Sequence, residues 1–288
     1  MASYFRPASL EEALVIRADA DVMPIAGGTD VYPAKVSRAG WGDMSHKDVL
    51  DISAITSLRG LSQSDTHWRL GALVTWSEVA RASLPASLRG LQQAAREVGG
   101  VQIQNRGTVA GNICTASPAG DGAPNLLALD AEIELASRTG TRRVAMRDFI
   151  TGYRQTACRP DELVTAILIP KLPEQAEAIF LKLGARRYLV ISIAMVSALA
   201  VCDGAGRILD VRLAVGACSA TPQRLASLEQ ALIGEPIAGA GAKVGKQHLA
   251  HLSPIDDVRG SAAYRLDAAL TLVRDALDGL AGSARRAA

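Results

Sequence analysis

Two glycine-bearing stretches decide how this chain folds: Ile25-Ala26-Gly27-Gly28-Thr29-Asp30 and Asn105-Arg106-Gly107-Thr108-Val109-Ala110-Gly111-Asn112. Each follows an apolar segment and combines small residues with hydroxyl and amide or carboxylate side chains. Residues without a bulky Cβ let backbone N–H groups come close to a pyrophosphate. For the first stretch alone, a plain strand-to-helix turn is an equally good explanation. Together, the two stretches predict an extended dinucleotide held from both sides.

The first stretch does not have the Rossmann pattern. The third glycine of Gly-x-Gly-x-x-Gly is missing, and no acidic residue is placed to hold a ribose. The second stretch is more specific because Ala116-Ser117-Pro118-Ala119-Gly120-Asp121 follows it. The hydroxyls suit phosphate or ribityl groups, and the carboxylate suits a sugar hydroxyl or a ring N–H. The alternative is a glycine-rich Ω-loop that only joins two elements.

Composition narrows the class of protein. The 288 residues are enough for a large core and two or three subdomains. The net charge of +2, with scattered Lys and Arg, gives no footprint for nucleic acid. No apolar run reaches the roughly 18 residues that span a membrane, and the N-terminus lacks the layout of a signal peptide. The sequence therefore predicts a cytoplasmic protein that binds neither nucleic acid nor membrane.

The cysteines and histidines are dispersed. Cys114, Cys158, Cys202 and Cys218 contain no Cys-x-x-Cys pair, so we expect isolated reduced thiols and neither a zinc nor an iron–sulfur site. No histidine lies near a serine or cysteine in a nucleophile motif, which gives little support to a hydrolytic triad. We predict no catalytic side chain and no metal ligand.

Apolar patterning outlines the elements before the second glycine stretch and after it. A capping box at Ser9 opens a helix to about residue 18, and strands at 22–26 and 48–52 complete a small β-α-β unit. A second capping box begins at Thr75. The other predicted elements are strands at 68–72, 132–137, 141–146 and 163–169, and helices at 87–98 and 124–129.

The best boundary in the chain is the polar, proline-bearing segment 171–177. Beyond it, β-rich runs at 191–202 and 207–217 flank Asp203-Gly204-Ala205-Gly206, a strong hairpin signal. Thr221-Pro222 predicts the start of a helix to about residue 233. With a last helix over about 261–280, the C-terminal third is expected to be an α+β layer.

The chain resembles the FAD-binding medium subunits of molybdenum hydroxylases, the xanthine dehydrogenase and carbon monoxide dehydrogenase family. The markers occur in order along nearly the whole chain. They are Ala26–Asp30, Gln102–Asn112, Ala116–Asp121, Gly152–Thr156, Asp161–Val164, Lys182 within Phe180–Arg187, and Asp257–Arg265.

The resemblance implies an α+β fold in two parts. A two-subdomain FAD-binding domain of the p-cresol methylhydroxylase type would cover residues 1–172, with subdomains of about 1–57 and 58–172. A C-terminal domain over 177–284 would carry an antiparallel sheet with helices on one side.

The resemblance also implies a non-covalent FAD and its binding residues. Residues 24–31 would hold the pyrophosphate, residues 108–112 would form its second side, and Asp121 would hydrogen-bond near the ribityl or the adenine ribose. Val164 would pack on the cofactor. Lys182 would reach it from the C-terminal domain, since reduction places negative charge at the flavin pyrimidine edge. The implied residues are Pro24, Ile25, Ala26, Gly27, Gly28, Thr29, Asp30, Val31, Thr108, Val109, Ala110, Gly111, Asn112, Ser117, Asp121, Val164 and Lys182.

Two departures from the family pattern concern the second loop and the flavin ring. Ala110 stands where many members have glycine, a change that still permits close approach. Val98 stands where a larger relative carries an aromatic residue near the ring. Tyr188 is an alternative neighbour of the flavin ring. It could equally be an aromatic residue that only starts a strand.

The function that the resemblance implies is electron transfer. The chain would take electrons from a small iron–sulfur subunit and pass them to NAD, oxygen or another acceptor. A large molybdopterin subunit would hydroxylate the substrate, in a hetero-oligomer such as a dimer of heterotrimers. Molybdopterin and iron–sulfur clusters would lie only in the partners. A stand-alone flavin oxidase and a flavin-free assembly module are the alternatives.

Overall fold

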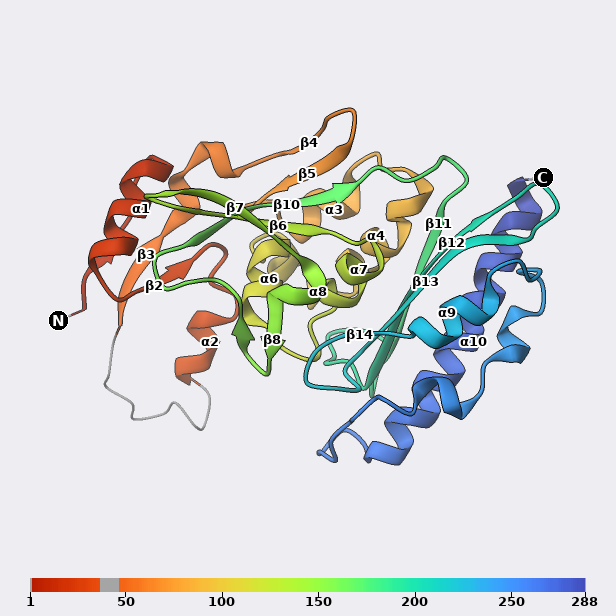
Figure 1. Cartoon of the computed structure of the whole chain (residues 1–288). Helices are drawn as coiled ribbons and strands as arrows, with labels where there is room; N and C mark the ends of the chain where they lie inside the picture. The colour runs from red at the N-terminus through yellow and green to blue at the C-terminus, as the bar shows by residue number, and fades with distance from the viewer. Residues whose placement is uncertain (1, 37–46, 288) are drawn as a thin grey trace.

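The computed structural model describes residues 2–36 and 47–287, and Figure 1 shows their arrangement. The N-terminal part is a three-stranded parallel sheet in the order β1 (Tyr4–Phe5), β3 (Asp48–Asp51), β2 (Val22–Ile25). Helix α1 (Leu10–Asp19) and helix α2 (Val31–Val36) belong to the same part. The predicted β-α-β unit is confirmed, and β1 is too short to show a pattern in the sequence.

The middle part is a five-stranded antiparallel sheet. Its strand order is β4 (Leu61–Gln63), β5 (His67–Gly71), β10 (Leu163–Pro170), β6 (Glu132–Ser137), β7 (Gly140–Ala145). The central strand β10 is buried from Leu163 to Ile169, which explains its continuous apolar run. A small hairpin joins β8 (Ile150–Gly152) to β9 (Gln155–Thr156). The helices of this part are α3 (Trp76–Arg81), α4 (Arg89–Glu97), α5 (Val101–Gln104), α6 (Val109–Thr115), α7 (Gly122–Ala128) and α8 (Met146–Phe149).

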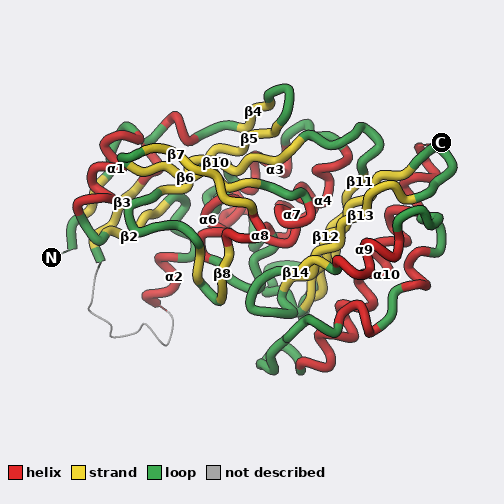
Figure 2. Tube along the Cα trace, in the orientation of Figure 1, coloured by secondary structure: helices red, strands yellow, loops and turns green. Residues whose placement is uncertain are grey.

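The C-terminal part is a four-stranded antiparallel sheet, β11 (Glu177–Leu183), β12 (Ala194–Cys202), β13 (Ile208–Gly216) and β14 (Gln223–Arg224). Helices α9 (Ala226–Leu232) and α10 (Ala262–Ala287) cover one face, as Figure 2 shows. The other face packs on α4 and α7 of the middle part. The predicted sheet with helices on one side is therefore confirmed.

Strand β12 shows why its sequence is apolar without alternation. Ala194, Val196 and Ala198 pack in the core beneath α9 and α10. The alternate residues face the middle part, where the Ser197 hydroxyl donates to Asn125 Oδ1 of α7 at 3.0 Å. Because successive side chains point to opposite faces and both faces are covered, every position of this strand except Cys202 is buried.

The predicted helix beginning at Thr221-Pro222 is wrong in its start. Gln223 and Arg224 instead form the edge strand β14, paired with Val215 and Ala214 of β13. Helix α9 begins only at Ala226. Pairing with the neighbouring strand overrides the local Thr-Pro signal, since the two residues gain ladder hydrogen bonds there.

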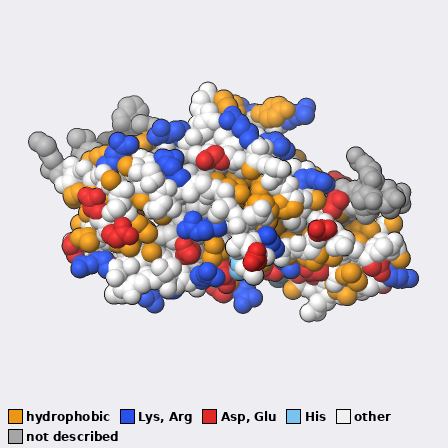
Figure 3. Space-filling view, turned by 90° about the horizontal axis from the view of Figure 1, so that it is seen from above, with side chains coloured by type: hydrophobic (Ala, Val, Ile, Leu, Met, Phe, Trp, Pro, Cys, Tyr) orange, Lys and Arg blue, Asp and Glu red, His pale blue; other side chains and the backbone are white. Residues whose placement is uncertain are grey.

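On the face shown in Figure 3, basic and acidic side chains are interspersed. All four cysteines are free thiols. Within residues 2–36 and 47–287, no helix combines the length and the apolar composition that crossing a bilayer requires. In the same residues, no three His, Cys, Asp or Glu side chains lie close enough to hold a metal ion.

Candidate functional site

The first glycine loop follows β2 and turns sharply at two glycines. Gly28 has a φ of 70°, a conformation that L side chains rarely adopt. Gly27 packs directly on the second loop, because a Cβ there would lie only 1.8 Å from the carbonyl oxygen of Arg106. The two stretches quoted from the sequence are therefore in contact, and only glycine allows that contact at position 27.

The second stretch contains a helix start as well as a loop. Thr108 is the N-cap of α6, and its Oγ1 accepts a hydrogen bond from Gly111 N at 2.9 Å. The stretch is anchored on the corner between β5 and α3, where Trp76 N donates to Gly107 O at 3.1 Å and Val109 N donates to Val74 O at 3.1 Å. Thr108 is buried, so this start of α6 is held rigidly in the core.

Both loops present backbone donors. Among the described residues, the N–H groups of Gly28, Thr29 and Ala110 have no hydrogen-bond partner. Gly28 and Thr29 precede α2 and Ala110 lies in the first turn of α6, where N–H groups have no partner within the helix. Unpaired N–H groups of this kind suit the phosphate oxygens of a dinucleotide.

A cavity of about 510 Å³ lies beside the contact between the loops. The first loop and β2 contribute Pro24, Ile25 and Ala26 to its lining, and the second loop contributes Ala110 and Gly111. Six of the predicted cofactor-binding residues line this one cavity: these five and Val164. Their small and apolar side chains suit the planar, partly apolar ring of a nucleoside.

A smaller, polar cavity of about 300 Å³ includes both loops in its lining. Gly27, Arg106 and Thr108 line it together with Arg6, at the end of β1, and Asp51 of β3. Asp51 is buried and accepts a hydrogen bond from Tyr4 Oη at 2.5 Å. The burial raises the pKa of Asp51, but the hydrogen bonds from Tyr4 and Ser53 outweigh it and hold the pKa below its usual range.

Asn112, in the middle of α6, is hydrogen-bonded to the residue that follows the predicted acidic residue Asp121. Its Oδ1 accepts a hydrogen bond from Gly122 N at 3.2 Å, at the start of α7. The preceding residue, Asp121, is buried and accepts from Lys182 Nζ at 2.6 Å and from Ser192 Oγ at 2.7 Å. Burial raises the pKa of Asp121, and the Lys182 ammonium and the Ser192 hydroxyl oppose that rise.

The structure therefore brings Asp121 and Lys182 together as an ion pair. Both side chains are only 5% exposed. Lys182 lies on β11 and Asp121 at the start of α7, so the pair joins the C-terminal sheet to the middle part. The lysine is therefore buried between two parts of the protein and is not a solvated residue at a strand end.

The remaining predicted residues lie around the loops. Asp30 is exposed and lies 3.4 Å from Arg154 Nη1, in the turn between β8 and β9. Ser117 Oγ accepts a hydrogen bond from Ala119 N at 3.3 Å. Val98 is partly buried against the core, whereas Tyr188 is 61% exposed.

Sequence reasoning missed several residues that line the larger cavity. Arg17 of α1, Cys114 of α6 and the run from Cys158 to Pro160 all do so. Burial raises the pKa of the Cys158 thiol to about 11, which keeps it protonated. The cysteine spacing contained no signal for a shared cavity, because Cys114 and Cys158 come from elements far apart in the sequence.

The fold and the cavity are those expected of a protein that binds a dinucleotide. Residues 1–172 match the family described as the FAD binding domain in molybdopterin dehydrogenase, and residues 179–280 match the CO dehydrogenase flavoprotein C-terminal domain. The chain therefore belongs to the family of FAD-binding subunits of molybdopterin dehydrogenases, which are oxidoreductases.

Known proteins resemble the chain over most of its length. The nicotinate dehydrogenase FAD-subunit of Eubacterium barkeri is 32% identical over 81% of this chain and 80% of that protein. The nicotine 6-hydroxylase medium subunit of Paenarthrobacter nicotinovorans is 30% identical over 94% of each chain. The reconstituted CO dehydrogenase from Oligotropha carboxidovorans contains a chain with a TM-score of 0.89 and 26% identity, over 98% of both chains. The expected family, fold and FAD are thus confirmed.

Proposed function

We propose that FAD binds non-covalently along the two glycine loops. Residues 24–31 and 108–112 hold the pyrophosphate, the larger cavity takes the AMP half, and the flavin half extends towards Asp121 and Lys182. The observation that carries this proposal is that both loops line one cavity and that each loop has N–H groups without a partner among the described residues. Domains over 1–172 and 177–284 would then share the cofactor, since Lys182 comes from the second of them.

In this proposal the chain relays electrons within a larger complex. FAD supplies redox chemistry that couples one-electron and two-electron steps when bound. The chain supplies position and electrostatics, because Lys182 places a cation near the proposed site and the loop N–H groups can donate hydrogen bonds to the phosphates. The relatives named as FAD-subunit and medium subunit support partners of the same kind here: a large molybdopterin subunit and a small iron–sulfur subunit.

The experiment that tests the relay is purification of the complex from its native cells through a tag on this chain. We expect mass spectrometry to identify a molybdopterin subunit and an iron–sulfur subunit. Removal of the flavin from that complex should abolish electron transfer to NAD, oxygen or another acceptor while substrate still reduces the iron–sulfur clusters. Full transfer by the flavin-free complex would contradict the relay, and substrate turnover by the isolated chain would favour a stand-alone flavin oxidase.

A further inference from the structure

One wall of the larger cavity is a loop that we call the 157–162 loop. It joins β9 to β10 and contributes Cys158, Arg159, Pro160 and Glu162 to the lining. Its backbone is weakly tied to the rest of the protein. Ala157 N donates to Phe149 O at 2.8 Å, and Cys158 N donates to Thr156 Oγ1 of β9 at 3.4 Å. In the described part of the chain, no backbone group of residues 159–161 bonds to another helix or strand.

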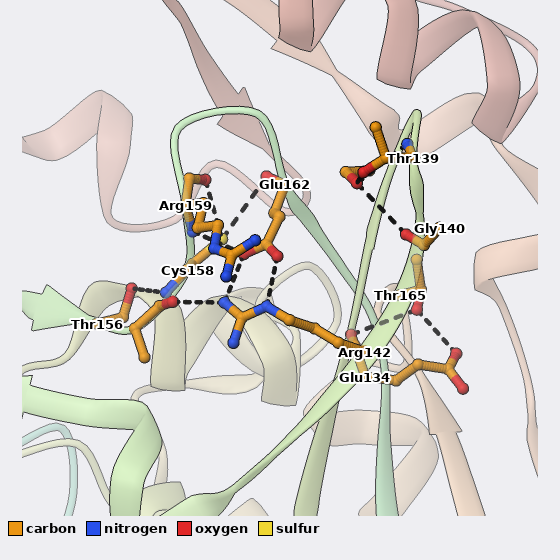
Figure 4. Close-up of polar contacts among 11 residues, drawn as sticks. Glu134, Thr139, Gly140, Arg142, Thr156, Cys158, Arg159, Glu162 and Thr165 are labelled. Carbon is orange, nitrogen blue, oxygen red and sulfur yellow. Dashed lines mark hydrogen bonds and ion pairs between the residues drawn. The ribbon is translucent and has the colours of Figure 1, made fainter.

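Figure 4 shows the ion pair of Arg142 and Glu162 beside this loop. The Arg142 guanidinium of β7 donates to both oxygens of Glu162, at 2.5 and 2.7 Å. The same guanidinium donates to Ala157 O at 2.8 Å, so one side chain fastens both ends of the 157–162 loop. Arg159 N adds a third hydrogen bond to the Glu162 carboxylate, at 2.7 Å. A bidentate arginine–carboxylate pair fixes geometry as well as charge.

Glu162 is also bonded from the N-terminal part of the chain. Arg17 lies on α1, in the N-terminal part, and also lines the cavity. Its Nε donates to Glu162 O at 3.4 Å, and its Nη1 donates to Val22 O of β2. Glu162 is therefore bound through its side chain from β7 and through its backbone from α1.

We propose that Arg142 and Glu162 are positioning residues that hold the 157–162 loop closed over the AMP half of FAD and so set how long the chain retains its cofactor. This inference rests on the proposed function, since it assigns the AMP half to this cavity. Neither residue needs to touch the cofactor, because the ion pair acts through the loop. Loss of the pair frees a loop that has few other bonds.

The test compares dissociation of FAD from the full-length wild type and from Arg142→Gln, followed by the rise of flavin fluorescence after dilution. We expect Arg142→Gln to release FAD about tenfold faster, which corresponds to about 1.4 kcal/mol. The dissociation constant for AMP, measured by calorimetry, should rise by a similar factor. The constant for FMN, which lacks the AMP half, should stay within about twofold.

Arg143→Gln is the matched control. Arg143 is the next residue on β7 and points to the other face. Among residues 2–36 and 47–287, its one ion pair is the exposed contact with Glu132 at 3.7 Å. If Arg142→Gln does not fold, Arg142→Lys replaces it, because a lysine keeps the charge but cannot bond to both ends of the loop. We expect this variant to release FAD at a rate between those of the wild type and Arg142→Gln.

Two results would overturn the inference. One is an unchanged rate of FAD release in the folded Arg142 variant, and the other is an equal rise of the dissociation constants for FMN and AMP. Failure of the wild type to bind FAD would instead contradict the proposed function itself. The two failures are therefore distinguishable in the same set of measurements.

Discussion

Gly27 is the residue at which the two loops touch, and any side chain there collides with backbone. A Cβ at this position would lie 1.8 Å from Arg106 O, so Gly27→Ala must push the loops apart. We expect a loss of about 1–3 kcal/mol in the free energy of unfolding and a fall in FAD affinity of about tenfold or more. Urea unfolding and fluorescence titration with FAD measure the two effects. Gly204→Ala is the control, because a Cβ there meets nothing within 4 Å.

The pair of Asp121 and Lys182 is the second residue-scale feature. Lys182→Met leaves a buried carboxylate with Ser192 as its remaining side-chain donor. Breaking a buried pair costs about 3–5 kcal/mol, and removing both charges costs less. We therefore expect Lys182→Met to unfold at much lower urea concentration, and the double variant Asp121→Asn/Lys182→Met to recover part of the loss. Wild-type stability in Lys182→Met would show that the pair contributes nothing.

Glu162 gives the site a pH dependence whose sign follows from its partners. The hydrogen bonds from Arg142 hold the pKa of Glu162 below its usual value of 4.5. The stabilisation is thus present above that value and is lost as the pH falls through the folded pKa. The charged and titratable groups around Glu162 are Arg142, Arg159, Arg17, Cys158 and Asp161.

The measurement is the difference in unfolding free energy between wild type and Glu162→Gln across pH. We expect a constant difference near neutral pH that shrinks as the pH falls below about 4.5. A difference that grows on acidification would contradict the assigned direction. The neutral amide of the variant does not titrate, so the change belongs to the wild-type carboxylate.

At this scale the sequence alone identified the glycines but not their partners. Two small-residue stretches are visible because backbone approach demands particular residue types. The ion pair of Arg142 and Glu162 leaves no such signal, since charged residues on a half-exposed strand are ordinary. That Asp121 and Lys182 meet depends on how the C-terminal sheet packs on α4 and α7, which no local pattern contains.

Among the elements, α6 connects the glycine loop to the core through its N-cap. Thr108→Ala removes the hydrogen bond to Gly111 N and is expected to cost about 1 kcal/mol of stability. It should also weaken FAD binding, because the first turn of α6 carries backbone N–H donors that face the proposed site. Ser9→Ala is the matched control: Ser9 caps α1 by accepting from Glu12 N at 3.1 Å, away from both loops. We expect a similar stability loss there, measured by urea, with FAD affinity unchanged.

Equal FAD affinity in Thr108→Ala and Ser9→Ala would contradict the role given to α6.

Most elements were predictable because caps and periodicity are local, as in α1 and in α3 with its capping box at Thr75. β14 was not, because a two-residue edge strand exists only through its pairing with β13. In the second glycine stretch the turn residues were visible in the sequence. Its helix α6 is too short to show the helical repeat of apolar residues, so the helix itself was not predicted.

In the whole molecule, the C-terminal sheet contributes to the proposed site and is not a separate unit. It packs on α4 and α7 through Arg89–Glu177 at 3.2 Å and Ser197–Asn125 at 3.0 Å, as well as through the buried lysine. The larger cavity lies on the other side of the same middle part, between β2 and β10. In the proposed binding mode, one dinucleotide therefore lies against all three sheets.

The central claim is that this chain binds one FAD non-covalently along its glycine loops. The most direct measurement is titration of the purified full-length chain with FAD, followed by acid precipitation and assay of flavin in the supernatant. The account predicts saturation at one FAD per chain, with all of the flavin released on precipitation, and clearly weaker binding by Gly27→Ala. A wild-type chain that binds no FAD, or that keeps flavin covalently in the pellet, would contradict it.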